Sequence, residues 1–136
     1  MPRLASPKST ISMAKKILIV DDNQHLRQIL ASMLRFSGYD ISEAATGIQA
    51  IEKAVSAKPN LILLDIDLPD IRGTEAAQAI HKDPRTAHIP ILGCSAYFGG
   101  EFREAALRAG MVDYLVKPVH AAVIRAKIEE FLLTER

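Results

Sequence analysis

Short, continuous apolar runs alternate along the chain with segments in which apolar residues recur every three or four positions. A continuous apolar run is typical of a strand that is buried on both faces of a parallel sheet. We therefore predict buried strands at four places: residues 17–20, 61–64, 89–94 and 114–116. A further short strand is predicted at 39–45.

Helical spacing fills the intervals between these runs. The predicted helices lie between Asp22 and Gly38, between Thr46 and Pro59, and at 74–82, 101–109 and 121–133. Thr46 is predicted as an N-cap and Gly38 as a C-terminal cap. Gly99 and Gly100 are expected to weaken the start of the fourth helix, by about 1 kcal/mol per glycine relative to alanine. In the last helix the residues expected to face inward are Val123, Ile124, Ile128, Phe131 and Leu132.

Five alternations of strand and helix predict an α/β fold, a doubly wound parallel sheet with right-handed crossovers. The 136 residues suffice for one domain, which we expect to occupy residues 15–136. The polar segment 1–14 is predicted to be a disordered leader or a cloning remnant. Charges interrupt every apolar stretch well before the roughly 20 residues that cross a bilayer, so we expect no membrane insertion.

The composition of the chain mainly excludes certain classes of binding partner. The net charge is +1, with 49% hydrophobic and 24% charged residues, which gives no case for direct nucleic-acid binding or for an anionic membrane as partner. Cys94 is the one cysteine, so no internal disulfide can form. A reducing compartment, the cytoplasm, is therefore the expected location.

Polar side chains follow the predicted strands where ligand chemistry collects in open α/β sheets. They are Asp21, Asp22, Asp65, Ser95 and Lys117. Acids gathered this closely raise one another's pKa unless a cation neutralises them, and Mg²⁺ accepts carboxylate ligands together with a phosphate. Lys117 and Ser95 could then contact phosphoryl oxygens, and a carboxylate beside the metal could act as a nucleophile.

These residues, taken together, resemble the receiver domain of two-component response regulators, and most closely the single-domain chemotaxis type. The matching motifs stand in the family's order from residue 15 onward: Asp21-Asp22, Asp65 with Pro69 and Gly73, Ser95-Ala96, Tyr114, and Lys117-Pro118. The resemblance implies a flavodoxin-like sheet with strand order 2-1-3-4-5.

The resemblance also implies a role for each residue. Asp65 would be the phosphoacceptor, with Ser95 and Lys117 contacting the phosphoryl group and Ser95 and Tyr114 forming the switch. The implied magnesium ligands are Asp22 and Asp65 directly, Asp21 through water, and the backbone carbonyl of Asp67. Pro118 would follow a cis peptide bond.

The implied function is a switch rather than an enzyme, with chemistry only on its own aspartate. A histidine kinase or histidine phosphotransfer protein would supply the phosphoryl group. The state would pass to an unidentified downstream protein through the face made by the fourth helix, the fifth strand and the fifth helix.

Three alternatives stay open at this point. Asp21 and Asp22 alone could cap the first helix. Asp65-Ile66-Asp67 resembles the nucleophile motif of haloacid-dehalogenase phosphatases, although only Glu129-Glu130 follow Lys117 where those enzymes carry a metal-binding acid pair. The chain could also be a receiver cut from a longer regulator with a DNA-binding domain.

Overall fold

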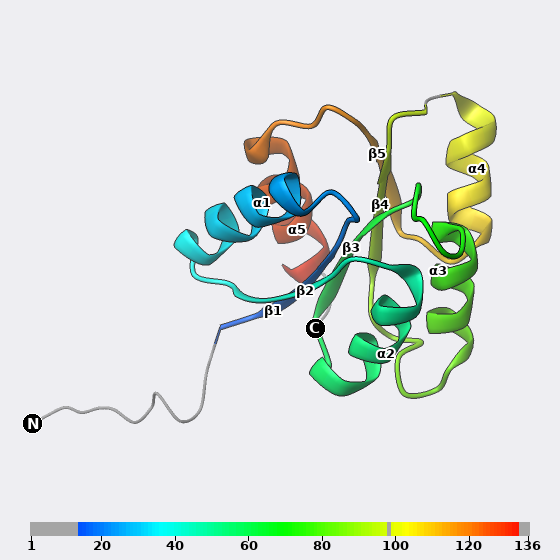
Figure 1. The fold of residues 1–136 in the computed structure, drawn as a ribbon, viewed down its shortest axis with the longest axis horizontal. Helices are drawn as coiled ribbons and strands as arrows, with labels where there is room; N and C mark the ends of the chain where they lie inside the picture. Colours follow the sequence, from blue (N-terminus) through cyan, green and yellow to red (C-terminus); the bar gives the residue numbers. More distant parts are fainter. Residues whose placement is uncertain (1–13, 98, 134–136) are drawn as a thin grey trace, which may run out of the picture.

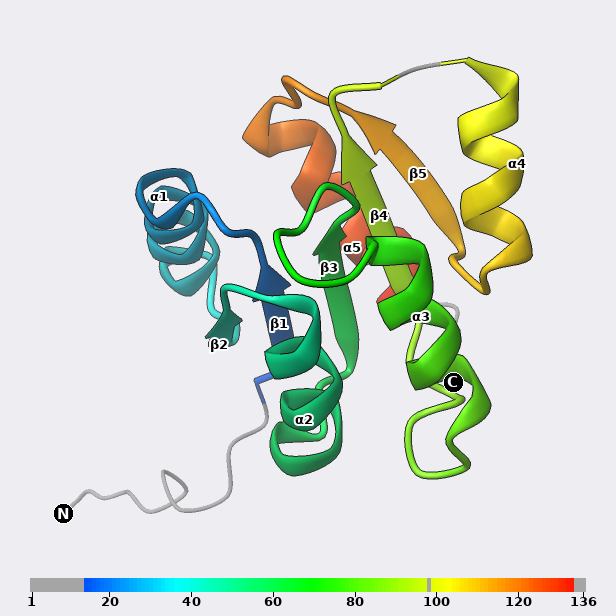
Figure 2. The same cartoon turned by 45° about the vertical axis from the view of Figure 1, so that its right-hand side comes forward.

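Five parallel strands form one sheet in the order β2-β1-β3-β4-β5 (Figure 2). The computed structural model describes residues 14–97 and 99–133, so residues 1–13 of the predicted leader lie outside the described part. The strands are β1 (Lys16–Val20), β2 (Asp40–Ala44), β3 (Leu61–Asp65), β4 (Ile91–Ser95) and β5 (Asp113–Val116). The predicted doubly wound α/β fold and its strand order are confirmed.

Helices cover both faces of this sheet, which Figure 1 shows edge-on. They are α1 (Gln24–Phe36), α2 (Gly47–Ala57), α3 (Gly73–Lys82), α4 (Gly100–Arg108) and α5 (Ala121–Leu133). α1 and α5 lie on one face, and α2, α3 and α4 lie on the other (Figure 1). Among the residues that the structure describes, no helix has both the length and the apolar character that crossing a membrane requires.

The central strands explain why their sequence runs are continuously apolar. In β1, Leu18 and Val20 pack toward α2, α3 and α4, whereas Ile17 and Ile19 pack toward α1 and α5. Every residue of β3 is buried. Since both faces of these strands are covered by helices, neither face has positions where polar residues reach water.

The helix boundaries follow the expected caps with one exception. The side chain of Thr46 accepts from the N–H of Gln49, and Gly38 has the positive φ of a helix C-terminus, +98°. The acid pair does not cap α1, however. Asn23 does so instead, because its side chain accepts from the N–H of Leu26 at 3.0 Å.

Two predictions about element limits and faces are wrong. β4 spans Ile91–Ser95 rather than 89–94, because Pro90 has no N–H to enter the strand ladder. Ser95 is therefore the last residue of the strand and not the first after it. In α5, Val123 is 45% exposed instead of inward, while Ile124 and Ile128 are buried as predicted.

The apolar residues of α1 divide between two faces. Ala31 and Leu34 are buried against the sheet. The exposed apolar side chains, which recur at intervals of three and four, are Leu26, Ile29, Met33 and Phe36, and the last of these is 94% exposed. The helical period of this segment therefore reflects an outer apolar stripe as well as a core face.

Candidate functional site

The fold brings the predicted polar residues to the carboxyl edge of four adjacent strands. Asp21 follows β1, Asp65 ends β3, Ser95 ends β4 and Lys117 follows β5. Because the strands are parallel, all of these ends lie at the same edge. Carboxylate oxygens of Asp21, Asp22 and Asp65 lie within 4.8 Å of one another.

Lys117 reaches into this acid cluster from the far side of β4. Its Nζ lies 3.2 Å from Oδ2 of Asp65 and 3.3 Å from Oδ2 of Asp21. The peptide bond between Lys117 and Pro118 is cis, as the resemblance implies. One ammonium group therefore faces two carboxylates at once.

Burial dominates the electrostatics of Asp65, which is 3% exposed. The pKa of Asp65 is raised to about 6, chiefly by burial and in smaller part by the charge of Asp21, while the N–H of Asp67 and the ammonium of Lys117 act against the rise. Burial also lowers the pKa of Lys117, but the charges of Asp65 and Asp21 outweigh it and hold that pKa above its usual value. At neutral pH Asp65 is therefore mostly ionised, beside a charged lysine.

The donor set fits a hard divalent cation. Three carboxylates face a single ammonium group, which leaves negative charge that oxygen-preferring Mg²⁺ would offset. Asp21 is held firmly in this cluster, since its Oδ1 accepts from the N–H of Asn23 at 2.9 Å and its carbonyl accepts from Arg27 at 2.7 Å.

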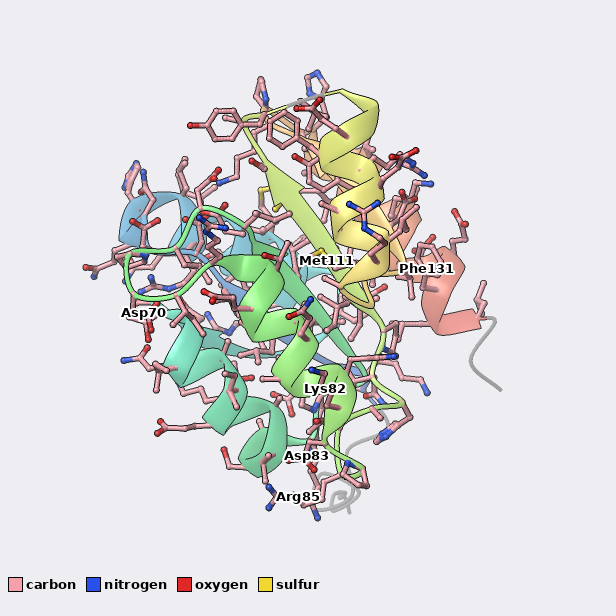
Figure 3. All side chains as sticks on the ribbon, turned by 90° about the vertical axis from the view of Figure 1, so that its right-hand side faces the viewer. Asp70, Lys82, Asp83, Arg85, Met111 and Phe131 are labelled. Carbon is pink, nitrogen blue, oxygen red and sulfur yellow. The ribbon has the colours of Figure 1, made fainter. Side chains whose placement is uncertain are left out.

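The loop between β3 and α3 is fixed to the start of α2 through Asp70 (Figure 3). Its two carboxylate oxygens accept from the N–H groups of Gly47 and Ile48, at 2.8 and 2.9 Å. These hydrogen bonds hold the pKa of Asp70 below its usual value. Asp70 thus satisfies two of the N–H groups that a helix start leaves without partners.

Gly73, the first residue of α3, packs directly on the backbone of the same loop. A Cβ at this position would lie 2.5 Å from Cα of Ile66 and 2.9 Å from the carbonyl oxygen of Asp65. Its φ is not positive, so the sequence motif's glycine serves close backbone approach rather than a special turn.

Ser95 is committed to two hydrogen bonds. Its hydroxyl donates to Oδ2 of Asp67 at 2.8 Å and accepts from the N–H of Tyr97 at 3.2 Å. Asp67 in turn donates its own N–H to Oδ1 of Asp65 at 3.1 Å. The hydrogen bond between the side chains of Asp67 and Ser95 was not predicted from the sequence.

Tyr114 already lies inside the protein, with 6% of its surface exposed. Its hydroxyl donates to the carbonyl oxygen of Tyr97 at 2.6 Å. The ring of Tyr97 stacks on Phe102 of α4, with ring centroids 5.5 Å apart. Hydrogen bonds therefore connect Tyr114, Tyr97, Ser95 and Asp67 in an unbroken chain.

Next to Tyr114, the buried carboxylate of Asp113 joins three elements, a contact that no sequence motif indicated. It lies 3.0 Å from Arg103 of α4 and 2.9 Å from Lys127 of α5. Burial raises the pKa of Asp113, but hydrogen bonds from Lys127 and from the N–H of Tyr114, with the charges of Lys127 and Arg103, hold it below its usual value.

Comparison with known proteins gives the same family that the site residues resemble. The family model of the response regulator receiver domain matches residues 17–129. The chain therefore belongs to the response regulator receiver domain family.

Individual relatives extend along the whole of this match. The polar-differentiation response regulator DivK of Brucella anthropi is 28% identical over 88% of this chain and 98% of its own length. The DNA-binding dual master transcriptional regulator RpaA of Synechocystis is 33% identical over 86% of this chain. The chain spans 48% of that relative's length. The receiver domain of the sensor histidine kinase PA1611 from Pseudomonas aeruginosa, solved with a magnesium ion in its active site cleft, has a TM-score of 0.80 at 33% identity, covering 88% of this chain and 98% of that one.

These findings set aside one of the alternatives from the sequence, the phosphatase. The protein is a phosphorylation-dependent switch of the two-component type, and receiver domains are signalling domains rather than enzymes in the ordinary sense. The phosphatase alternative is set aside, because the family match covers the acid pair and the lysine together.

Proposed function

We propose that Asp65 accepts the phosphoryl group and that Ser95 and Lys117 contact it once it is bound. The observation that supports this most is the position of Asp65, a buried carboxylate at the end of β3 with an ammonium group 3.2 Å away. In the proposed reaction a carboxylate oxygen of Asp65 attacks phosphorus, and the donor's phosphorus–nitrogen bond breaks. The bonding electron pair returns to the imidazole nitrogen of the donor histidine.

Lys117 would stabilise charge on the phosphoryl oxygens, since its ammonium group already faces Asp65 and Asp21. We propose Mg²⁺ as the cofactor, held by Asp22 and Asp65, by Asp21 through water and by the backbone carbonyl of Asp67. When bound, the ion would supply positive charge next to the phosphoryl oxygens. The carboxylate cluster and the magnesium-bound Pseudomonas relative support this assignment.

The proposed phosphodonor is a histidine kinase or a histidine phosphotransfer protein. The outer stripe of α1 supports a helical docking partner, because its exposed apolar residues follow the three-and-four spacing by which one helix packs on another. The stripe also begins next to the acid cluster, since Asn23 caps α1 directly after Asp22. A partner on this stripe would have its reacting group within reach of Asp65.

The proposed output surface is the face of α4, β5 and α5. It carries exposed apolar side chains, among them Phe102 on α4, Val116 on β5 and Val123 on α5. The tyrosine predicted to switch, Tyr114, lies on β5, the one strand of this face. A downstream protein is the proposed partner there, and direct nucleic-acid binding is not part of the proposal.

We further propose that residues 15–136 form the receiver domain and that it works in the cytoplasm. The family match over 17–129 supports the first statement. In support of the second, the one cysteine cannot form an internal disulfide, and burial raises the pKa of the Cys94 thiol to about 12, which keeps it protonated and unreactive.

The acceptor assignment is tested with a small-molecule phosphodonor and magnesium. We expect the parent protein to gain the mass of one phosphoryl group, and Asp65→Asn to gain none. Asp40→Asn, an exposed aspartate at the start of β2, is the matched control and should be phosphorylated like the parent. Equal, base-labile phosphorylation of Asp65→Asn would refute the assignment.

The metal assignment is tested by thermal unfolding in a magnesium titration. Magnesium should raise the melting temperature of the parent by mass action, because it binds the folded cluster and not the unfolded chain. Asp22→Ala should abolish the rise, whereas Asp40→Asn should keep it. A full magnesium response in Asp22→Ala would remove Asp22 from the ligand set.

A further inference from the structure

We propose that the side chain of Asp67 is a positioning residue that holds the hydroxyl of Ser95 in the resting state and thereby limits how readily the switch engages. This inference rests on the proposed function of Asp65 and adds a regulatory role for its neighbour. A hydroxyl group has a single proton to donate. While Ser95 donates it to Asp67 at 2.8 Å, that proton is not available to a phosphoryl oxygen.

The hydrogen bond from Ser95 to Asp67 can compete with a hydrogen bond from Ser95 to a phosphoryl oxygen. Ser95 is 1% exposed, so its hydroxyl meets little water while the Asp67 side chain is in place. The acceptor is a carboxylate, and hydrogen bonds to charged acceptors are about twice as strong as neutral ones. The Asp67 N–H is bonded to Oδ1 of Asp65, which fixes the residue between the acceptor and the switch serine.

The rest of the switch is already in place in this structure. Tyr114 is buried, and its hydroxyl is bonded to Tyr97, whose N–H donates to the Ser95 hydroxyl. The hydroxyl proton of Ser95 is thus the group in this chain of contacts that has to change partner when a phosphoryl group arrives. Breaking the bond to Asp67 is the cost of that change.

The first test measures the binding affinity for beryllofluoride, a phosphoryl mimic, by fluorine NMR at saturating magnesium. If only a fraction of the molecules have a free Ser95 hydroxyl, the apparent association constant is the intrinsic constant multiplied by that fraction. Asp67→Ala should therefore bind beryllofluoride about tenfold more tightly than the parent. Asp67→Asn removes the charge but keeps an accepting oxygen, and it should change the affinity by less than about threefold.

A double-mutant cycle separates the hydrogen bond from the charge. With Ser95→Ala as background, Asp67→Ala should change the affinity by less than about threefold, since there is no hydroxyl left to release. An equal change in both backgrounds would overturn the proposal. So would equal effects of Asp67→Ala and Asp67→Asn, because the charge alone would then explain them.

A second measurement needs no phosphoryl chemistry. In ¹⁵N–¹H spectra of the ligand-free protein, Asp67→Ala should shift the Tyr97 amide, because the hydroxyl that accepts from it reorients, and Asp67→Asn should shift it less. An unmoved Tyr97 amide would overturn the hydrogen-bond competition by itself. By contrast, beryllofluoride binding that survives Asp65→Asn would refute the acceptor assignment and leave this spectral test to decide on Asp67.

Discussion

Helices α2 and α4 pack on the same face of the sheet, yet they are held in different ways. The first N–H groups of α2 are bonded by Thr46 and by both oxygens of Asp70, and its residues Gly47, Ala50 and Ala54 are buried. α4, all of which lies in the described part, starts after Gly99 without a side-chain cap and buries Ala106 alone. The core thus fixes one helix, whereas contacts at the surface attach the other.

In the proposed function, this difference separates the chemistry at Asp65 from its readout at α4. The loop after Asp65 is bound to α2 through Asp70, so the Asp65 side of the site rests on the well-packed helix. Besides the buried Ala106, α4 is tied to its surroundings by the Arg103–Asp113 ion pair and by the stacking of Phe102 on Tyr97. We expect signalling motions to occur on the α4 side, because few buried contacts oppose them there.

The variant expected to change the free energy of unfolding most is Gly47→Ala, at the start of α2. The new Cβ would overlap Cγ1 of Ile71, so the Ile71 side chain has to move. Overpacking of this kind costs about 2 kcal/mol of unfolding free energy, measured by denaturant titration. Ile71→Ala should remove most of that cost in the double variant, and a full cost there would show that the contact is not the cause.

Asp113→Asn should lower the free energy of unfolding by a smaller amount, about 1–2 kcal/mol. It weakens the attachment of α4, and the effect is modest because the partners of Asp113 are themselves partly exposed. The pKa of Asp113 is depressed in the folded protein. Its contribution is therefore fully present above the unfolded pKa, about 3.9, and is lost as pH falls through the folded value.

Unfolding followed from neutral pH downward checks this prediction. The stability difference between the parent and Asp113→Asn should shrink as pH falls below about 4. Arg103→Ala serves as a narrower variant that should affect α4 and spare the contact with Lys127. A difference that stays constant down to strongly acidic pH would mean that the charge of Asp113 does not matter.

Gly100→Ala should have the smallest effect and the opposite sign from Gly47→Ala. Both glycines open a helix, but a Cβ at Gly100 meets no atom within 4 Å. Alanine restricts the unfolded chain more than glycine does, so the variant should gain about 0.5–1 kcal/mol. Amide exchange in α4 should slow accordingly, and a destabilised Gly100→Ala would contradict the open environment of this helix start.

The sequence predicted the fold well because the strongest signals were consistent with one another. Continuous apolar runs and helical spacing identify all ten elements, and the order of Asp21, Asp65, Ser95 and Lys117 identifies the family. Side-chain partners were harder to foresee. The contacts of Asp67 and Asp113 depend on which way each carboxylate turns after folding, and no spacing rule encodes that. The outer stripe of α1 was overlooked because its period coincides with that of the core face.

The close packing of Gly73 limits which amino-acid substitutions this protein can tolerate. Because backbone atoms of Asp65 and Ile66 occupy the space of a Cβ at this position, no neighbouring side-chain change can make room for one. In a library of all single substitutions we expect Gly73 to accept no replacement, whereas Gly47, which faces a side chain, should accept one once Ile71 is smaller. The least substitutable position beside Asp65 would then be a residue with no side chain and no part in the proposed chemistry.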